Sequence, residues 1–166
     1  MHKELKKING DIKNLAESEN KIYYFGRFLP SVNVMFIAEM PTIPPKNIGW
    51  YPEDNFPHLA GLFEKFGLGG SYITDIVKTS TKAGRPTQKE IDKYFPFLER
   101  EIELLKPKII VALGDNAFKI LRSKLGTKYN IKMIWHPAYV SRYNRWEKYE
   151  KQIKDRVLNS LQAAQP

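Results

Sequence analysis

Nearly continuous apolar runs alternate with amphipathic segments along the chain, and this alternation predicts its fold. Four short runs rich in Val, Ile and Leu lack the polar alternation of a half-exposed strand, so they predict strands buried on both faces. They lie at residues 31–38, 72–77, 108–113 and 131–135. Apolar residues three and four positions apart predict helices at 3–19, 56–66, 87–105, 115–125 and 146–162. Strands and helices in this order predict an α/β fold, a three-layer α/β/α sandwich with a central, mainly parallel four-stranded sheet.

Local signals sharpen the ends of these helices and mark one long loop. Thr87 followed by Glu90 has the spacing of a capping box. Asp115 or Asn116 is expected to cap the helix after the third strand. The segment 40–57 is rich in Pro, Gly and aromatic residues. A loop of this length in a compact domain is usually functional.

The length of 166 residues favours a single domain, 1–166. No internal repeat or low-complexity tract divides the chain. Within the domain we expect residues 1–30 to form an N-terminal helical extension and residues 146–166 to form a closing helix.

Charge and composition narrow the classes of function. Lys and Arg number 27 against 18 Asp and Glu, which gives a formal net charge of +9. Such a field favours a polyanionic partner such as DNA, although a basic surface can also serve solubility alone. The chain has no Cys, which excludes disulfides, cysteine-ligated zinc, iron–sulfur clusters and thiol nucleophiles. It also has no glycine-rich phosphate-binding motif, which disfavours dinucleotide and NTP enzymes.

The sequence shows no feature of a membrane or secreted protein. No run approaches the roughly 20 apolar residues that a membrane helix needs, and the first residues lack the apolar segment of a secretion signal. We therefore expect no membrane partner and a cytoplasmic location. The three His leave little for a metal site, so we expect no metal or organic cofactor.

Polar side chains stand at the carboxyl ends of three predicted strands. Glu39 follows the first strand, Asp75 lies near the end of the second, and His136 follows the fourth. In parallel sheets, ligands bind beyond these ends. We therefore expect the three side chains to meet at one cleft.

Four segments at these strand ends carry a family resemblance. They are Ala38-Glu39-Met40-Pro41-Thr42; Tyr72-Ile73-Thr74-Asp75-Ile76-Val77-Lys78 with Arg85-Pro86-Thr87; Pro107-Lys108-Ile109-Ile110-Val111-Ala112-Leu113-Gly114; and His136-Pro137-Ala138-Tyr139-Val140-Ser141-Arg142. In order and placement they resemble the uracil-DNA glycosylase superfamily, nearest to the family-4 type of archaea and bacteria. The chain departs from that pattern because it lacks the iron–sulfur cysteines and has Asp75 where the family has Asn. It also has Ala38 and Thr42 where the first motif has glycines.

The resemblance implies a monofunctional DNA glycosylase that needs no cofactor. Such an enzyme hydrolyses the N-glycosidic bond of a deaminated base, above all uracil, flipped out of DNA, and so initiates base excision repair. His136 is the implied donor to the departing base, and Glu39 is the implied group that positions water or stabilises the sugar cation. The implied base-binding residues are Asp75, Phe56, Trp50 and Met40, with Tyr51 as an alternate stacking residue.

The same resemblance assigns the contacts with DNA. Tyr139 and Val140 stand where the family inserts a wedge into the duplex. The implied backbone contacts are Ser141, Arg142, Arg145, Lys82 and Arg85. The expected partner is single- or double-stranded DNA with a damaged base, bound by a monomer that is nucleoid-associated.

Asp75 bears on which base is accepted. An Asn offers the base one acceptor and one donor, whereas an ionised Asp offers acceptors only. If burial keeps Asp75 protonated, it can mimic Asn. We therefore expect altered or broadened base specificity.

Structural roles for the same residues remain open alternatives. His136 can cap a strand end, Glu39 can be a solvated loop carboxylate, Asp75 can cap a turn, and Phe56 can be a core residue. For the whole protein, the alternative is a catalytically weak or inactive DNA-binding member of the same fold. A third interpretation is a small-molecule enzyme, such as a nucleoside hydrolase, on an unrelated doubly wound sheet.

Overall fold

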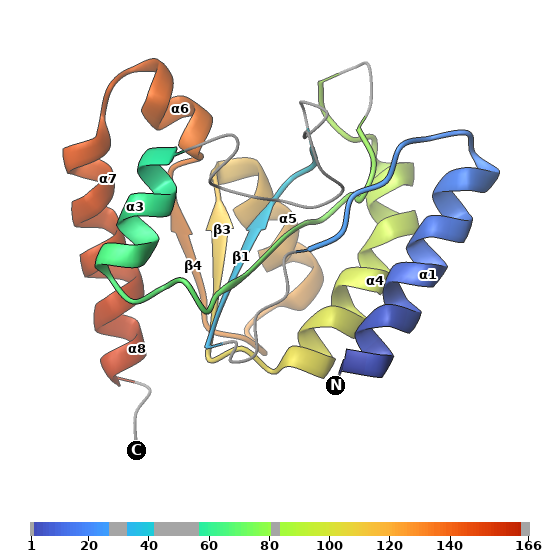
Figure 1. Ribbon diagram of the computed structural model, residues 1–166, viewed down its shortest axis with the longest axis horizontal. Coiled ribbons are helices and arrows are strands. Elements are labelled where there is room, and N and C mark those ends of the chain that lie inside the picture. Colours follow the sequence, from blue (N-terminus) through green and yellow to red (C-terminus); the bar gives the residue numbers. More distant parts are fainter. Residues whose placement is uncertain (1, 27–32, 42–56, 81–83, 164–166) are drawn as a thin grey trace.

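The central element is a parallel sheet of four strands in the order β2-β1-β3-β4. The computed structural model describes residues 2–26, 33–41, 57–80 and 84–163 (Figure 1). The strands are β1 (Val34–Ala38), β2 (Tyr72–Asp75), β3 (Ile109–Leu113) and β4 (Ile131–Ile134). The four predicted strands are therefore confirmed, each with slightly shorter bounds, and every pairing is parallel.

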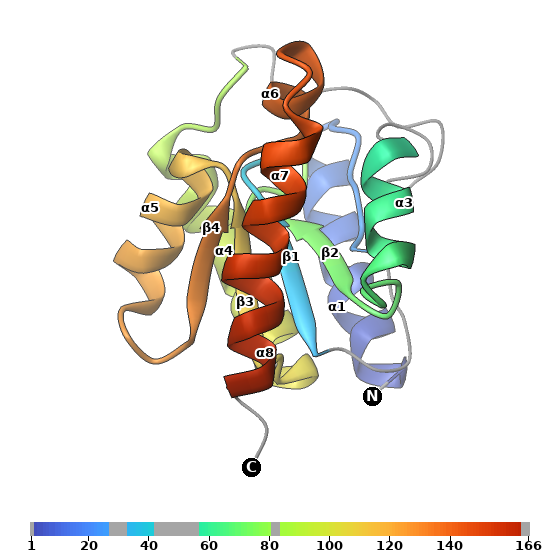
Figure 2. The same ribbon diagram turned by 90° about the vertical axis from the view of Figure 1, so that its left-hand side faces the viewer.

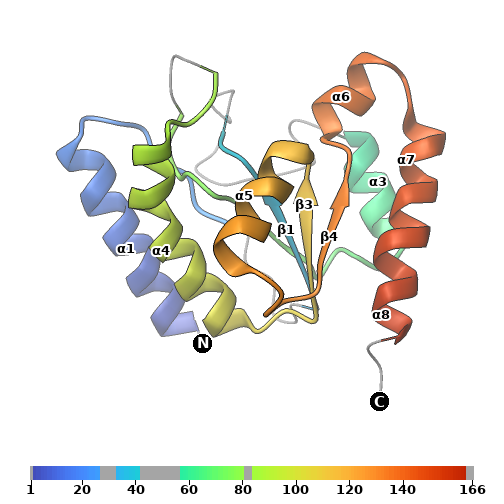
Figure 3. The same ribbon diagram turned by 180° about the vertical axis from the view of Figure 1, so that it is seen from behind.

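Both faces of the sheet are covered, which explains the continuous apolar runs. Along β1 the buried side chains alternate between two separate core clusters, with Met35 and Ile37 in one and Phe36 in the other. The first cluster lies under α1 (His2–Ser18), α4 (Gln88–Leu105) and α5 (Asp115–Leu125). The second lies under α3 (Pro57–Lys65), α6 (Pro137–Arg142) and α7 (Trp146–Gln152) with its continuation. Figures 1 and 3 show these two helical layers on opposite sides of the sheet, which confirms the three-layer α/β/α sandwich.

The helix ends agree with the expected capping only in part. At α4, Thr87 and Glu90 form the predicted capping box. At α5, the expected side-chain cap is wrong. Gly114 is the N-cap with a φ of 98°, and no side chain caps this end. The positive φ favours glycine. Because Asn116 does not cap the helix, its side chain can make another contact.

The closing helix is not uniform. It begins as α7, widens into a π-helical segment η1 (Ile153–Leu158) and ends as α8 (Asn159–Ala163). Figure 2 shows these three pieces as one rod across the face of the sheet. Ile153 and Val157 are fully buried within the wider segment.

The chain after α1 pairs with the segment that follows β2. Tyr23 forms an isolated antiparallel bridge with Thr79, and the Tyr24 N–H donates to the Lys78 carbonyl at 2.8 Å. A Cβ on Gly26 would lie 2.2 Å from the Tyr72 hydroxyl oxygen, so only glycine fits there. Within the described ranges, no helix combines the length and apolar character needed to cross a membrane.

Candidate active site

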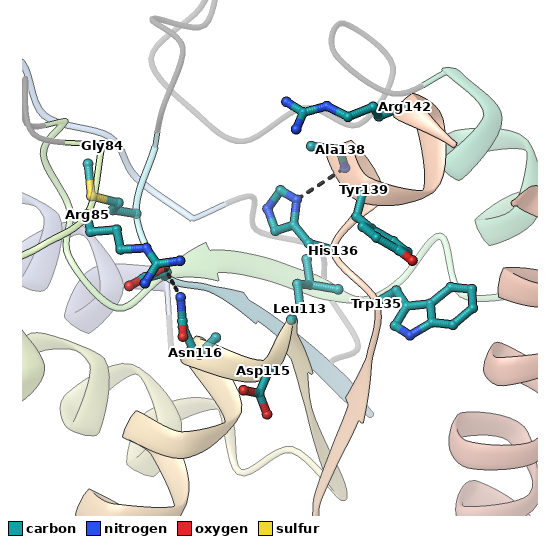
Figure 4. A pocket seen from close by; sticks show the side chains of 14 residues that line it. Gly84, Arg85, Leu113, Asp115, Asn116, Trp135, His136, Ala138, Tyr139 and Arg142 are labelled. Atoms are coloured by element: carbon teal, nitrogen blue, oxygen red, sulfur yellow. Dashed lines mark hydrogen bonds between the residues drawn. The ribbon is translucent and has the colours of Figure 1, made fainter. Parts of the chain in front are cut away.

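A hollow of about 900 Å³ lies beyond the carboxyl ends of the strands, where a parallel sheet binds its ligands. This volume is in the range of pockets that enclose small organic molecules. Among the described residues, its lining consists of Glu39, Met40, Gly84, Arg85, Leu113, Gly114, Asp115, Asn116, Ala117, Trp135, His136, Ala138, Tyr139 and Arg142 (Figure 4). The segments after β1, β3 and β4 therefore meet at one site.

His136 is fixed between the end of β4 and the start of α6. Its backbone is extended, with φ −69° and ψ 135°, and Pro137 follows as the first helical residue. The Ala138 N–H donates to His136 Nδ1 at 3.1 Å, so the imidazole caps α6 (Figure 4). The segment 137–142, where the apolar spacing predicted no helix, is thus a helix whose first turn orients the histidine.

The start of α5 packs against this histidine from the neighbouring strand. The Gly114 N–H donates to the Ile134 carbonyl at 2.8 Å, which ties the end of β3 to the end of β4. A Cβ on Gly114 would lie 3.4 Å from the Cβ of His136. Two backbone segments therefore hold the position of His136.

Burial keeps the His136 ring neutral. Removal from water lowers the pKa of the imidazole below its usual value. Because Nδ1 accepts a hydrogen bond from the backbone, the proton of the neutral ring resides on Nε2. A neutral ring in this tautomer carries one N–H donor, on Nε2.

Glu39 directly follows β1 and also lines the hollow. Its carbonyl accepts from the Val77 N–H at 3.1 Å, which anchors the backbone to the segment after β2. Its side chain is half-buried, and Asn116 Nδ2 donates to Glu39 Oε2 at 3.5 Å (Figure 4). This long hydrogen bond orients the carboxylate.

Asn116 is the site residue that the sequence interpretation missed. It was expected as a helix cap, but its amide instead holds Glu39, while Asp115 pairs with Lys119 one turn along α5 at 2.6 Å. The signal was present, because Asn116 follows the end of β3 just as Glu39 follows the end of β1. Trp135, which also lines the hollow, was missed because it was counted only as the last residue of a strand.

Asp75 ends β2 and is buried rather than part of the described lining. Its Cα pairs in register with Ala38, the residue before Glu39, and its side chain is 3% exposed. Oδ1 is buried without a hydrogen-bond partner. Burial raises the pKa of Asp75 to about 7, the Lys78 ammonium opposes this, and the Glu101 carboxylate adds to it. The orphaned oxygen is an unusual feature that structure alone does not explain.

A fully buried ion pair lies near Asp75 on the α4 side of the sheet. Lys78 Nζ donates to Glu101 Oε2 at 2.7 Å and to Thr74 Oγ1 at 2.5 Å, and the Tyr72 hydroxyl donates to Glu101 Oε1 at 3.0 Å. Both charged side chains are 1% exposed or less. The sequence did not single out this network.

Among the residues predicted to contact DNA, four are exposed near the hollow and one lies in the core. Arg85, Arg142 and Tyr139 line the hollow and are exposed. Ser141 is exposed on α6 without lining it. Val140 is fully buried in the core under α6, so the expectation that it enters the DNA stack is corrected. Helical spacing is the cause, since it turns Val140 inward where it turns Tyr139 outward.

The remaining predicted residues divide into one that the structure locates and three that it does not describe. Arg145 is the N-cap residue of α7, and its guanidinium lies 5.9 Å from the centres of the Trp135 and Tyr139 rings. Trp50, Phe56 and Lys82 lie outside the described residues.

No residue set suited to a metal ion is found in the part of the chain that the structure describes. The iron–sulfur cluster that the family-4 resemblance brings with it does not fit this chain, because the sequence contains no Cys.

Comparison with known proteins agrees with this geometry. The model of the family described as the Uracil DNA glycosylase superfamily matches residues 14–162. The chain is 36% identical to the type-4 uracil-DNA glycosylase of Sulfurisphaera tokodaii over 132 residues, which cover 74% of this chain and 58% of that relative. It is 36% identical to the type-5 uracil-DNA glycosylase of Pyrobaculum aerophilum over 55 residues, which cover 33% of this chain and 24% of that relative. The chain thus matches less than two thirds of the length of either relative.

The family match begins at residue 14, near the end of α1, and continues to residue 162 in α8. It includes the parallel sheet and the three strand ends that form the hollow. On these grounds, the chain belongs to the uracil DNA glycosylase superfamily.

Proposed function

We propose that this protein is a DNA glycosylase that hydrolyses the N-glycosidic bond of uracil, or of a related deaminated base, extruded from DNA. The observation that carries the proposal is the placement of Glu39 and His136 in the walls of one hollow at the carboxyl edge of the sheet. A carboxylate and a neutral imidazole are the two groups that this reaction needs on opposite sides of the breaking bond.

His136 is the proposed donor to the leaving base. As the bond between sugar and base breaks, negative charge collects on a carbonyl oxygen of the uracil ring. The Nε2–H of the neutral imidazole then donates a hydrogen bond that strengthens as this charge develops. The cap from Ala138 to Nδ1 fixes the ring for this task before substrate binds.

Glu39 is the proposed partner of the sugar. The departing base leaves an electron-poor sugar ring with the character of an oxocarbenium ion. A carboxylate stabilises this cation and accepts a proton from the water that attacks it. Asn116 donates to one oxygen of Glu39 and orients the carboxylate.

The products proposed are a free base and an intact abasic site. An enzyme that also cuts the strand commonly needs an amine that forms a Schiff base with the sugar. The proposed reaction needs no such amine and ends at the abasic site.

Asp75 is proposed to read the edge of the base. Its buried Oδ1 has no partner, so an N–H of a bound base would satisfy it. A pKa of about 7 means that the protonated, Asn-like form is populated near neutral pH. Asp75 therefore supports a preference for uracil that weakens as the pH rises. Met40, which lines the hollow and is 5% exposed, supplies an apolar contact for the base.

DNA is the proposed partner of the basic rim. Arg142 and Ser141, both exposed on α6, and Arg85, which lines the hollow, are the proposed phosphate contacts. The proposal includes a monomer acting on chromosomal DNA in the cytoplasm, as the start of base excision repair. Trp50, Phe56 and Lys82 stay predictions for base stacking and phosphate contact.

A single-turnover assay of base release tests the proposal. Oligonucleotides with one uracil, hypoxanthine or xanthine, as single strands and in mismatches, are incubated with excess protein and then cleaved at abasic sites with alkali. We expect cleavage at uracil by the wild type, and a loss of roughly 10²–10³-fold with His136→Asn. Asn keeps an acceptor for the α6 cap, so this change removes the ring donor without removing the cap. Binding of every substrate without cleavage of any would instead identify a non-catalytic DNA-binding member of the fold.

A further inference from the structure

Three aromatic side chains form a continuous surface that leads away from the hollow. Trp135, Tyr139 and Tyr143 are spaced four residues apart, which places them on one side of α6 and its flanks. The ring centres of Trp135 and Tyr139 are 5.4 Å apart, and those of Tyr139 and Tyr143 are 4.8 Å apart. Figure 4 shows Trp135 and Tyr139 together on one wall, on the far side of His136 from Asn116.

This surface is unusually exposed for its chemistry. Among the described residues, the exposed large hydrophobic side chains are Ile22, Tyr139 and Tyr143. Two of these three are neighbours here, with Tyr139 40% and Tyr143 55% exposed. Grouped aromatic rings on a surface mark a site of interaction more often than scattered ones do. The rings also continue the wall of the hollow, because Trp135 and Tyr139 line it.

Positive charge surrounds the same rings. The Arg145 guanidinium is 5.9 Å from the centres of both the Trp135 and the Tyr139 ring, within cation–π distance of each. Arg142 lies at the edge of the hollow one helical turn from Ala138. A surface of exposed ring faces with guanidinium groups beside them suits a ligand that carries both flat π systems and negative charge.

We propose that Trp135, Tyr139, Tyr143 and Arg145 form a stacking platform for the unpaired nucleotides that flank the extruded base. The inference rests on the proposed glycosylase function for the position of that base in the hollow. Bases next to it in a single strand or a melted segment can turn their faces to the rings, while Arg145 contacts the strand's phosphates.

The geometry favours unpaired over paired DNA as the ligand. In a duplex each base face is covered by its neighbours, so a protein reaches only groove edges and phosphates. Single strands present their faces to aromatic side chains, and this contact tolerates any sequence because every base has a π face. The platform therefore predicts a preference for single-stranded or locally melted DNA.

The test compares binding of undamaged single-stranded and duplex oligonucleotides of one sequence, measured by fluorescence anisotropy. Undamaged DNA keeps the test independent of base release, so it stands even if the protein cleaves nothing. We expect Tyr143→Ala to weaken single-strand binding roughly 5- to 100-fold, the range for loss of one base stack. Duplex binding should change less than about threefold, since rim charges account for it.

Matched variants separate stacking from other effects. Tyr143→Phe keeps the ring and should restore single-strand binding, whereas Tyr143→Leu keeps apolar area without a π face and should not. Ile22→Ala removes an equally exposed hydrophobic side chain on another part of the molecule and should change neither Kd. Tyr143→Ala should also leave the slope of log Kd against log salt unchanged, because it removes no charge. An equal loss for single strands and duplexes, no loss for either, or rescue by Leu would overturn the proposal.

Discussion

Two glutamates illustrate how this fold uses a carboxylate in opposite ways. Glu101 is fully buried and accepts hydrogen bonds from Lys78, Tyr72 and Thr74. Glu39 is half-buried at the hollow and accepts one long hydrogen bond from Asn116. The first carboxylate is held by three hydrogen bonds inside the core, whereas the second borders the hollow.

The contrast separates a structural charge from a chemical one. A carboxylate whose acceptors are all occupied contributes to the fold and has nothing left to offer a substrate. One beside a cavity, with spare acceptors, is available for water or a sugar cation. Asp75 combines features of both, because it is as buried as Glu101 yet keeps an unpartnered oxygen.

The largest effect is expected from breaking the buried pair. Lys78→Met leaves the Glu101 carboxylate buried without its counter-ion, which should lower the free energy of unfolding by about 3–5 kcal/mol. Chemical denaturation at pH 7 measures this change. The double variant Lys78→Met with Glu101→Leu removes both charges and should recover much of the loss. A loss below about 1 kcal/mol in the single variant would show that Glu101 is not held as a buried charge.

Asp75 should make the free energy of unfolding fall as the pH rises, whereas most carboxylates in folded proteins make it rise. Its pKa is raised from 3.8 to about 7. Between these values the folded protein keeps a proton that the unfolded chain has lost, so stability falls as pH rises through this range. Asp75→Asn removes this fall and should gain on the order of 1–4 kcal/mol relative to wild type at pH 8, but little at pH 4.

Urea unfolding of both proteins from pH 4 to pH 8 tests the Asp75 prediction. The lowered pKa of His136 gives both proteins a pH dependence of the opposite sign. Because this contribution is the same in both proteins, the difference between the two curves isolates the effect of Asp75. A difference that is constant with pH would mean that Asp75 is ionised throughout the range. In base release, the same variant should raise uracil cleavage most at alkaline pH.

Asn116 is expected to give the smallest effect. Its hydrogen bond to Glu39 is long, so Asn116→Ala should slow single-turnover base release by about 2- to 10-fold, the range for a modest net hydrogen bond. Asn130→Ala, on an exposed residue just before β4, is the matched control and should leave the rate unchanged. An Asn116→Ala rate equal to that of wild type would contradict this positioning role.

The sheet was predictable because burial on both faces leaves a continuous apolar pattern in the sequence. The same rule identified three strand ends, and two of them, Glu39 and His136, do line one hollow. The buried network was not predictable, since Lys78 and Glu101 are brought together only by the packing of α4 on the sheet. Spacing within one element gives no information about such a pair.

Helix α6 shows a second limit of sequence patterns. Its six residues are too few for a clear hydrophobic period, and the helix starts through a cap from His136 that the sequence does not reveal. Its existence changed the role of Val140 from a DNA contact to a core residue. The π-helical segment η1 was not predicted either. The apolar residues of the closing helix keep a spacing that is typical of an ordinary α-helix.

Direct detection of free uracil by mass spectrometry, in single turnover with wild type and Glu39→Gln, tests the proposed chemistry of the hollow most directly. Gln keeps the size of the side chain but removes its charge and its basicity. We expect the wild type to release uracil and leave an uncut abasic strand, and Glu39→Gln to be slower by roughly 10²–10⁴-fold with DNA binding preserved. Release by Glu39→Gln at a rate within threefold of wild type, or no release by wild type from any uracil strand that it binds, would contradict the assignment.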